Sequence, residues 1–263
     1  MTQTSVSVVI VSRGRPAALS LCLRAVARLT HPAFEVIVVA DPDGLSAVEG
    51  LEFSHMIKTV PFDEANISAA RNRGVAQAAG QVVAFLDDDA VPEPRWLHHL
   101  VSAFDDPDVA AAGGYVRGRN GISFQWRGRI LDQTGQAQNV ALNSLNPTKL
   151  TPPPGWAVKT EGTNMAVRRD VLAQVGGFDP AFRFYMDETD LNMRLARLGH
   201  ATAIVPLAQV HHGFAASAYR RPDRGVLDLQ QIAASTAVFL RKHCPAHRHA
   251  SLLQAAFKEQ RTR

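Results

Sequence analysis

The amino-acid sequence predicts an α/β fold built on a single doubly wound, mostly parallel sheet that is flanked by helices and followed by a helical C-terminal extension. Short apolar runs of strand type alternate with helix-like stretches through residues 1–116. These runs are apolar almost without interruption, as expected of strands that helices cover on both faces. A chain of 263 residues, 46% of them hydrophobic, can form one large domain of this kind with an ample core.

The first half of the chain contains the clearest elements. Residues 5–11 (SVSVVIV) predict a buried strand, and a helix is expected over residues 16–29, where Leu19, Leu23 and Val26 recur at helical spacing. The other elements expected in this half are strands at 34–40, 56–62 and 81–86 and an alanine-rich helix at 68–79 that ends before Gly80. This order indicates repeated strand–helix units.

The second half is less regular. Residues 110–116 predict another strand, whereas residues 117–156 are rich in Gln, Asn, Gly and Pro and predict an irregular segment. Later elements are expected as helices at 166–174 and 189–198, a pair of strands within 201–212, and an amphipathic helix at 227–242; the tail from residue 243 is the least determined part. We divide the chain into one domain, 1–220, with halves 1–116 and 117–220, and an extension, 221–263.

Composition and charge exclude several classes of protein. No apolar run approaches the roughly 20 residues that span a bilayer, and MTQTSVSVVIVSRGRP lacks the basic start of a signal peptide. Cys22 and Cys244 have no metal or redox spacing, so a reducing cytoplasm is the default. The net charge of +4 fits an anionic small ligand or an acidic membrane surface, but it is too weak and scattered to indicate nucleic-acid binding.

Three consecutive carboxylates, Asp87, Asp88 and Asp89, follow the predicted strand 81–86, and two prolines in VPEPRW then prevent strand or helix from continuing. Alone, such a triplet is often a solvated loop or a turn. Its position at the carboxyl end of a core strand is, however, the place where open α/β sheets bind ligands. A divalent cation would relieve the repulsion among the carboxylates, so the triplet indicates a cation or ligand site.

Three other features fall on the same predicted edge of the sheet. Asp41 ends the strand 34–40, MDETDL precedes the helix 189–198, and His211 and His212 end the run 201–212. Each has an ordinary structural explanation: a turn residue, a negative first turn that the helix dipole favours, and a pair of surface histidines. The combination is better explained by a single functional site.

Six stretches, in a fixed order and at a fixed spacing, resemble one known family. They are VSVVIVSRGRP, FEVIVVADPDG, ISAARNRGVAQAAGQVVAFLDDDAVPEPRWL, GTNMAVRRDVLAQVGGFD, FYMDETDLNMRLARLG and VHHGFAAS. With these motifs, covering roughly residues 6–217, the chain resembles family 2 glycosyltransferases of the GT-A fold. The resemblance implies an enzyme that moves a sugar from a nucleotide-diphosphate sugar to an acceptor hydroxyl and inverts the anomeric configuration. It assigns nucleotide binding to residues 1–116 and acceptor binding and catalysis to residues 117–220.

The resemblance identifies the acidic triplet with the DXD motif of that family. It implies that Asp87 lies near the nucleotide ribose and the metal, that Asp88 orients the site, and that Asp89 binds the divalent cation, Mn²⁺ or Mg²⁺, which bridges the diphosphate. His211 would add a metal ligand, with His212 as the alternative one residue on.

The resemblance also implies a set of nucleotide-binding residues. Asp41 would hydrogen-bond the nucleobase, and the arginines suit a diphosphate because a guanidinium donates two parallel hydrogen bonds. The full set is Ser12, Arg13, Arg15, Asp41, Arg71, Asn72, Asp87 and Asp88.

The catalytic base of the family is normally the second residue of a Glu-Asp pair just before a helix. Here the pair is Asp187–Glu188, so the order is reversed: Glu188 occupies the base position and Asp187 remains its rival. The residues expected near the donor sugar or the acceptor are Gly162, Thr163, Asn164 and Trp156. The segment 117–156 is expected to set acceptor specificity.

The family's usual setting implies a saccharide or glycolipid acceptor, a role in polysaccharide or glycolipid assembly, and a cytoplasmic location with peripheral contact at the inner membrane face. Two alternatives stay open. One is a catalytically silent homologue that binds nucleotide sugars. The other is a sugar-phosphate nucleotidyltransferase, although SRGRP lacks the glycine-rich loop expected of that class.

Overall fold

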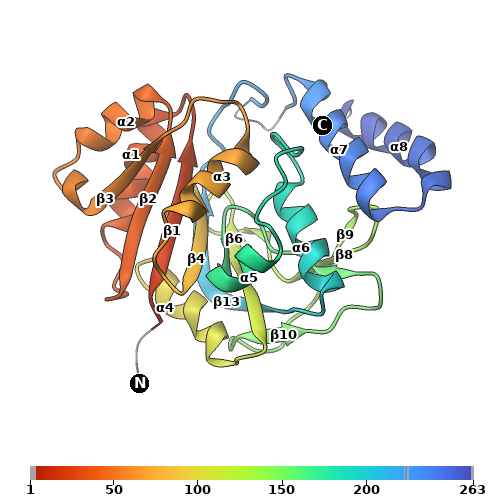
Figure 1. Ribbon diagram of the computed structural model, residues 1–263, viewed down its shortest axis with the longest axis horizontal. Coiled ribbons are helices and arrows are strands. Elements are labelled where there is room, and N and C mark those ends of the chain that lie inside the picture. Colours follow the sequence, from red (N-terminus) through yellow and green to blue (C-terminus); the bar gives the residue numbers. More distant parts are fainter. Residues whose placement is uncertain (1–3, 222, 224, 262–263) are drawn as a thin grey trace.

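The computed structural model describes residues 4–221, 223 and 225–261. A central mixed sheet runs through the molecule, and helices cover it on both faces (Figure 1). Its strands lie in the order β10-β13-β6-β12-β4-β1-β2-β3, with β5 paired to β13 and β7 paired to β6. The predicted α/β class is confirmed.

The part of the sheet formed by the first four strands is parallel, as the sequence predicts. These strands are β1 (Val6–Ser12), β2 (Phe34–Ala40), β3 (Ile57–Pro61) and β4 (Val82–Asp87). β1 lies between β2 and β4, and Val11 is in register with Asp87. Since parallel strands share the edge at which they end, the residues that follow β1 and β4 meet there.

Strand β12 (Met165–Arg168) is the main departure from the predicted elements. It runs antiparallel between β4 and β6 (Val109–Arg117), where the sequence predicts the start of a helix over 166–174. That helix, α5, covers only Arg169–Gln174. The prediction is wrong over the first residues because a short apolar run does not distinguish a buried strand from a buried helix.

Strand β13 (Ala201–His212) is one long strand rather than the predicted pair. It pairs in parallel with β6, and its register is interrupted between Val205 and Gln209. Pro206 lies within this interruption, and a proline favours such a break because it cannot donate a ladder hydrogen bond. The end of β13 therefore continues past the break to pair with β5 (Ala90–Pro92) beside the acidic triplet.

The segment predicted to be irregular, 117–156, contains several short strands. β7 (Phe124–Trp126) and β10 (Thr148–Leu150) join the central sheet. A small second sheet has the order β11-β8-β9, formed by Ala157–Val158, Arg129–Leu131 and Ala137–Asn139. The long loops between these strands agree with the predicted irregularity.

The helices divide between the two faces of the sheet because neighbouring strand residues point in opposite directions. One face packs against α1 (Pro16–Val26), α2 (Pro42–Glu49) and α4 (Trp96–Val101); the other packs against α3 (Ile67–Ala76), α5 and α6 (Asp187–Arg197). Single 3₁₀ turns occupy Ser54–Met56, Ser102–Asp105 and Ala246–Arg248. Helices α2 and α4 are missing from the prediction because both are short.

The C-terminal extension forms α7 (Leu229–His243) and α8 (His249–Arg261), which lie beside α6 and the β8–β9 hairpin (Figure 1). Phe239 of α7 is fully buried in a cluster with Phe182, Met186 and Met193. In the part of the chain that the structure describes, no helix has both the length and the apolar character needed to cross a membrane. The domain boundary at residue 220 stays a prediction.

Candidate active site

The acidic triplet ends β4 at Asp87 and forms the turn to β5 with Asp88 and Asp89. β5 runs antiparallel to the end of β13, and Ala90 is in register with His212. This pairing brings Nε2 of His212 to 3.4 Å from Oδ1 of Asp89. One ligand atom each from Asp87, Asp89 and His212 lies within 4.8 Å of the other two. Two carboxylates and an imidazole at this spacing fit a divalent cation such as Mn²⁺.

The structure places His212, the alternative, beside the carboxylates, and it places His211 elsewhere. Nε2 of His211 lies 2.6 Å from a carboxylate oxygen of Glu93. Consecutive residues of a strand face opposite sides, so only one of the two histidines can face the triplet. The geometry therefore favours His212, the alternative, over His211 as the candidate metal ligand.

The second carboxylate of the triplet, Asp88, is fully buried. It accepts a hydrogen bond from Oγ of Ser12 at 2.7 Å and another from Nε of Arg15 at 3.0 Å. Burial raises the pKa of Asp88 to about 7, against the opposing effects of Arg15 and Ser12. Its contacts tie the triplet to the loop after β1, which agrees with an orienting role.

Asp89 has a different electrostatic environment. Burial alone would raise its pKa, but the hydrogen bond and the charge of His212, together with Arg15, outweigh burial and lower the pKa of Asp89 to about 2. The backbone N–H of Ala215 also donates to Oδ2 of Asp89 at 2.8 Å. Asp89 is therefore ionised at neutral pH, as a cation ligand must be.

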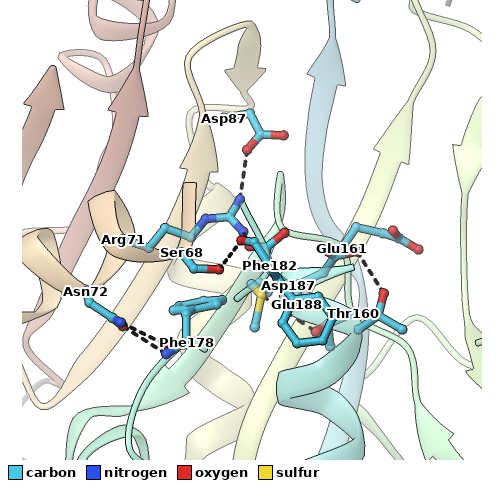
Figure 2. A network of polar contacts seen from close by, with 12 residues as sticks. Ser68, Arg71, Asn72, Asp87, Thr160, Glu161, Phe178, Phe182, Asp187 and Glu188 are labelled. Carbon is cyan, nitrogen blue, oxygen red and sulfur yellow. Dashed lines mark hydrogen bonds and ion pairs between the residues drawn. The ribbon is translucent and has the colours of Figure 1, made fainter. Parts of the chain in front are cut away.

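Arg71 connects the triplet to the acidic pair at the start of α6. Nη2 of Arg71 lies 3.1 Å from Oδ1 of Asp87, and its Nη1 donates to Asp187; Figure 2 shows Arg71 between the two carboxylates. The side chain of Arg71 is only 4% exposed, and its guanidinium lies 5.3 Å from the ring centroid of Phe178. A Cβ atom on Gly162 would lie 2.5 Å from Nη2, so a glycine leaves room for the guanidinium.

The acidic pair occupies the first turn of α6. Met186, the residue just before it, has a φ of 66°, a left-handed conformation that is strained for a side chain of this kind. Oε1 of Glu188 lies 2.6 Å from Nζ of Lys159, and that ammonium also lies 3.1 Å from Glu161. Glu188 is therefore held by a buried lysine.

The two acids of the pair differ in protonation. Burial opposes ionisation of both, but the ion pair with Lys159 lowers the pKa of Glu188 to about 2. Burial and the neighbouring Glu188 raise the pKa of Asp187 to about 7, against the effect of Arg71. The side chain of Glu188 is 18% exposed and that of Asp187 only 3%. Glu188 is thus the ionised and more accessible member of the pair.

A cavity of about 140 Å³ opens at the carboxyl ends of β1 and β2. Ser12, Arg13 and Arg15 from the loop after β1 line it, opposite Phe62 and Tyr219. Nε of Arg13 lies 3.1 Å from the exposed carboxylate of Asp63. The cavity therefore presents arginines beside aromatic rings, which can contact a phosphate and a base respectively.

Two predicted nucleotide-binding residues make contacts that support the backbone. Asp41 caps α2 by accepting from the N–H of Gly44 at 3.0 Å, and its other oxygen accepts from the N–H of Gly14 at 2.7 Å. The amide nitrogen of Asn72 donates to the carbonyl oxygen of Phe178 at 2.7 Å, and the side-chain oxygen of Asn72 accepts from the N–H of Phe178 at 2.9 Å. The structure does not bring Asn72 to the acidic triplet.

The residues predicted to lie near the donor sugar or the acceptor also have different surroundings in the structure. Asn164 is fully buried and bonds Trp96 and the backbone oxygens of Tyr115 and Ala208. Its contacts join α4, β6 and β13. Gly162 touches Arg71, as described above, while Thr163 next to it is buried. Trp156 lies half-buried in the turn before β11.

Comparison with known proteins decides the family. A sequence profile described as "Glycosyltransferase like family 2" matches residues 3–223. The chain belongs to glycosyltransferase family 2. The family 2 profile ends before α7, so the helices α7 and α8 lie outside the matched region.

Individual relatives agree with this assignment. The chain is 29% identical over 234 residues to the O-antigen biosynthesis protein RfbC of Myxococcus xanthus, a match that covers 83% of this chain and 18% of that protein. The chain therefore spans less than a fifth of the length of this relative.

Two solved structures share the fold. The chain superposes on GalNAc-T7 with UDP, GalNAc and Mn²⁺ at a TM-score of 0.68 and 16% identity, covering 91% of this chain and 48% of the other. It superposes on the mannosyltransferase PcManGT from Pyrobaculum calidifontis, in complex with GDP-Man and Mn²⁺, at a TM-score of 0.67 and 18% identity, covering 98% and 70%. These likenesses confirm the predicted GT-A fold of this family 2 glycosyltransferase.

Sequence reasoning missed two charged residues of the site in this glycosyltransferase. Lys159 and Glu161 follow β11; Lys159, only 7% exposed, contacts Glu188, and Glu161 contacts the same ammonium of Lys159. In the sequence they stand in AVKTEGTN, next to Gly162. The available signal was a lysine that directly follows the apolar residues Ala157 and Val158. Its partner Glu188 lies 29 positions away, and no local sequence pattern identifies that pairing.

Proposed function

We propose that this glycosyltransferase is metal-dependent and inverting, and that it moves a sugar from a nucleoside-diphosphate sugar to an acceptor hydroxyl. One observation carries the proposal: the charged contacts that converge on the acid pair. Arg71 joins Asp87 to Asp187, and Lys159 pairs with the next residue, Glu188. This arrangement places carboxylates suited to a cation next to an acid pair suited to proton transfer. The family 2 membership favours sugar transfer over nucleotidyl transfer, the competing enzyme class.

The cation would be held by Asp87, Asp89 and His212. The set of ligands fits a cation because three ligand atoms, from two carboxylates and one imidazole, lie within 4.8 Å of one another. Both GT-A structures named above contain Mn²⁺, which supports Mn²⁺ or Mg²⁺ for this chain. A cation bound there would stabilise the negative charge that develops on the departing diphosphate.

The donor would lie along the cavity at the ends of β1 and β2. Arg15 is anchored by Asp88 and directed at Asp89, with Nη1 at 3.5 Å from its carboxylate, so its guanidinium lies beside the proposed cation site. Arg13, which is half exposed and lines the cavity, is free of such a buried anchor and can turn toward a phosphate. The two arginines would thus contact the diphosphate from the side of β1.

Glu188 would act as the base that takes the proton from the acceptor hydroxyl. A base must be ionised before it accepts a proton, and the pKa directions of the pair make Glu188 the ionised acid. Its low pKa lessens its strength as a base. Displacement of Lys159 from Glu188 as an acceptor binds would raise that strength.

The acceptor would be a saccharide or a glycolipid in glycan assembly. The relative named for O-antigen biosynthesis supports this class. The irregular segment 117–156, whose β8–β9 hairpin contributes to the sheet beside Lys159, is where we expect acceptor specificity to be set. The cytoplasmic location and the contact with the inner membrane face stay predictions from the sequence.

The proposal is tested by amide substitutions at the acid pair. Glu188→Gln should keep donor and Mn²⁺ affinity, measured by calorimetry, and should lose sugar transfer by a factor of about 10²–10⁴, since an amide cannot take the proton. Asp187→Asn should be less harmful. Glu49→Gln is the matched control, because it makes the same chemical change at an exposed acid of α2, on the other face of the sheet from α6, and should keep most transfer.

Three other outcomes contradict parts of the proposal. If Asp187→Asn is silent and Glu188→Gln transfers sugar, the base is Asp187. If both variants keep near-parental rates, the pair is structural. If the parent neither transfers nor hydrolyses any of a panel of UDP-, GDP- and dTDP-sugars with Mn²⁺ present, yet binds one of them, the chain is the catalytically silent homologue.

A further inference from the structure

Helix α7 lies outside the family 2 match but makes buried contacts with the helix that carries the acid pair. Its last residue, His243, has a fully buried side chain. Nε2 of His243 lies 2.8 Å from Oδ1 of Asp190, which is also fully buried. Asp190 stands one turn along α6 from the acid pair, and its N–H closes the first helical turn on the carbonyl of Met186.

The neighbouring residue of α7 strengthens this attachment. Nζ of Lys242 lies 2.7 Å from the same oxygen of Asp190 and 2.7 Å from a carboxylate oxygen of Asp179. The other oxygen of Asp190 accepts from Nε of Arg194 at 2.7 Å. Asp190 is therefore enclosed by three basic groups, two of which come from the end of α7.

An apolar contact holds the same helix against the residue that precedes the acid pair. Phe239 of α7 packs in one cluster with Met186, and its ring lies 4.6 Å from that of His243. Met186 has the left-handed φ of 66°. Such a conformation persists only where the surroundings enforce it. Helix α7 thus packs on the strained residue and at the same time binds Asp190 in the first turn of α6.

Stability alone does not account for a histidine at this position. A buried ionic contact is an inefficient stabiliser compared with apolar side chains of similar size. Nδ1 of His243 is buried and has no hydrogen-bond partner among the described residues, which adds a further cost. What the histidine does provide is a directional contact to α6, through an oxygen of Asp190.

We propose that His243, with the end of α7, is a positioning residue for sugar transfer: through Asp190 it fixes the first turn of α6 and so the direction in which Glu188 points. The C-terminal extension is then part of the transfer machinery of this chain. The inference rests on the proposed function, because it assigns His243 to the alignment of the same acid pair.

The experiment compares three substitutions of His243 in the full chain. A glutamine amide can reach Asp190 from about the place of Nε2, an asparagine amide is too short, and a leucine keeps the volume without a donor. We expect His243→Leu and His243→Asn to lower kcat between about tenfold and 100-fold, the range that a small misplacement of a catalytic group produces, and His243→Gln to recover most of the parental kcat. The dissociation constants for donor nucleotide and Mn²⁺ should stay within about twofold, since the substitutions are remote from both.

A matched control separates positioning from stability. Val26→Ala, at the end of α1 on the other face of the sheet and 2% exposed, removes buried apolar contacts far from Asp190, so it should lower the melting temperature and leave kcat near the parental value well below that temperature. The inference is overturned if His243→Asn and His243→Gln both keep the parental kcat, or if kcat follows the melting temperature across all four variants. A parent without any transfer activity would instead refute the proposed function.

Discussion

The buried carboxylate of Asp190 should make the folding free energy of the protein depend on pH. Burial alone would raise its pKa, but the hydrogen bond with His243 and the charges of Arg194 and Lys242 lower the pKa from 3.8 to about 2. A pKa difference of that size corresponds to about 2 kcal/mol of folding free energy. Because the folded-state pKa is the lower one, this stabilisation is present above pH 4 and is lost as the pH falls toward 2.

Asp190→Asn keeps the shape of the side chain and removes its titration. Loss of the buried charge leaves three basic groups without a full partner, so the variant should be less stable than the parent at pH 7 by about 3–5 kcal/mol. Between pH 5 and pH 2 the difference in unfolding free energy between parent and variant should shrink by about 2 kcal/mol. Urea titrations followed by tryptophan fluorescence measure this difference, since Trp96 is fully buried.

Two further results decide the interpretation. Asp108→Asn, at an exposed carboxylate that pairs with Lys149, should show only a small difference from the parent over the whole pH range. A stability difference between the parent and Asp190→Asn that stays constant from pH 5 to the lowest pH with a folded baseline would refute the linkage. The buried contacts of Asp190 would then not distinguish its charged form from its neutral form.

Three other predictions concern the metal, the nucleotide and the core. Donor turnover should require Mn²⁺ or Mg²⁺ and should stop in excess EDTA; turnover that persists there contradicts the cation role of Asp89. Asp41→Ala should weaken nucleotide binding by about 1.5–3 kcal/mol if Asp41 hydrogen-bonds the base, whereas equal affinity in calorimetry would leave it only the capping role at α2. Gly114→Ala should destabilise the fold by about 3 kcal/mol or more in thermal denaturation, because the new Cβ would lie 1.9 Å from the backbone oxygen of Ala208. Gly50→Ala, whose Cβ would have no neighbour closer than 3.7 Å, is its control and should be neutral or slightly stabilising.

The parallel half of the fold was predictable because its signals are local. Residues 34–40 and 82–86 are apolar runs that end in aspartates, and a parallel sheet necessarily brings such ends together. The same rule predicted that the acidic triplet lies at the carboxyl edge of the sheet, where the structure has it. Asp87, Asp88 and Asp89 were assigned from position in the chain, with no knowledge of their contacts.

The rest of the site depends on contacts between residues that are distant in the sequence, and a single sequence does not reveal such contacts. Which of two adjacent histidines faces the triplet depends on the register between β13 and β5, and β13 reaches β5 only after the break near Pro206 in its pairing with β6. The Lys159–Glu188 ion pair joins residues 29 positions apart. Strand β12 was mistaken for helix because a strand of four residues, three of them buried, carries no usable period.

The position of β12 also determines when this protein can fold during synthesis. Met165 is in register with Phe85 of β4 on one side and with Gly113 of β6 on the other. Until residue 168 has left the ribosome, β4 and β6 have no strand between them, and each presents an open hydrogen-bonding edge to the cell. A nascent chain that ends at residue 116 is therefore an incomplete sheet that is prone to pairing with other chains, and we expect residues 1–116, the predicted nucleotide-binding half, to aggregate when expressed alone.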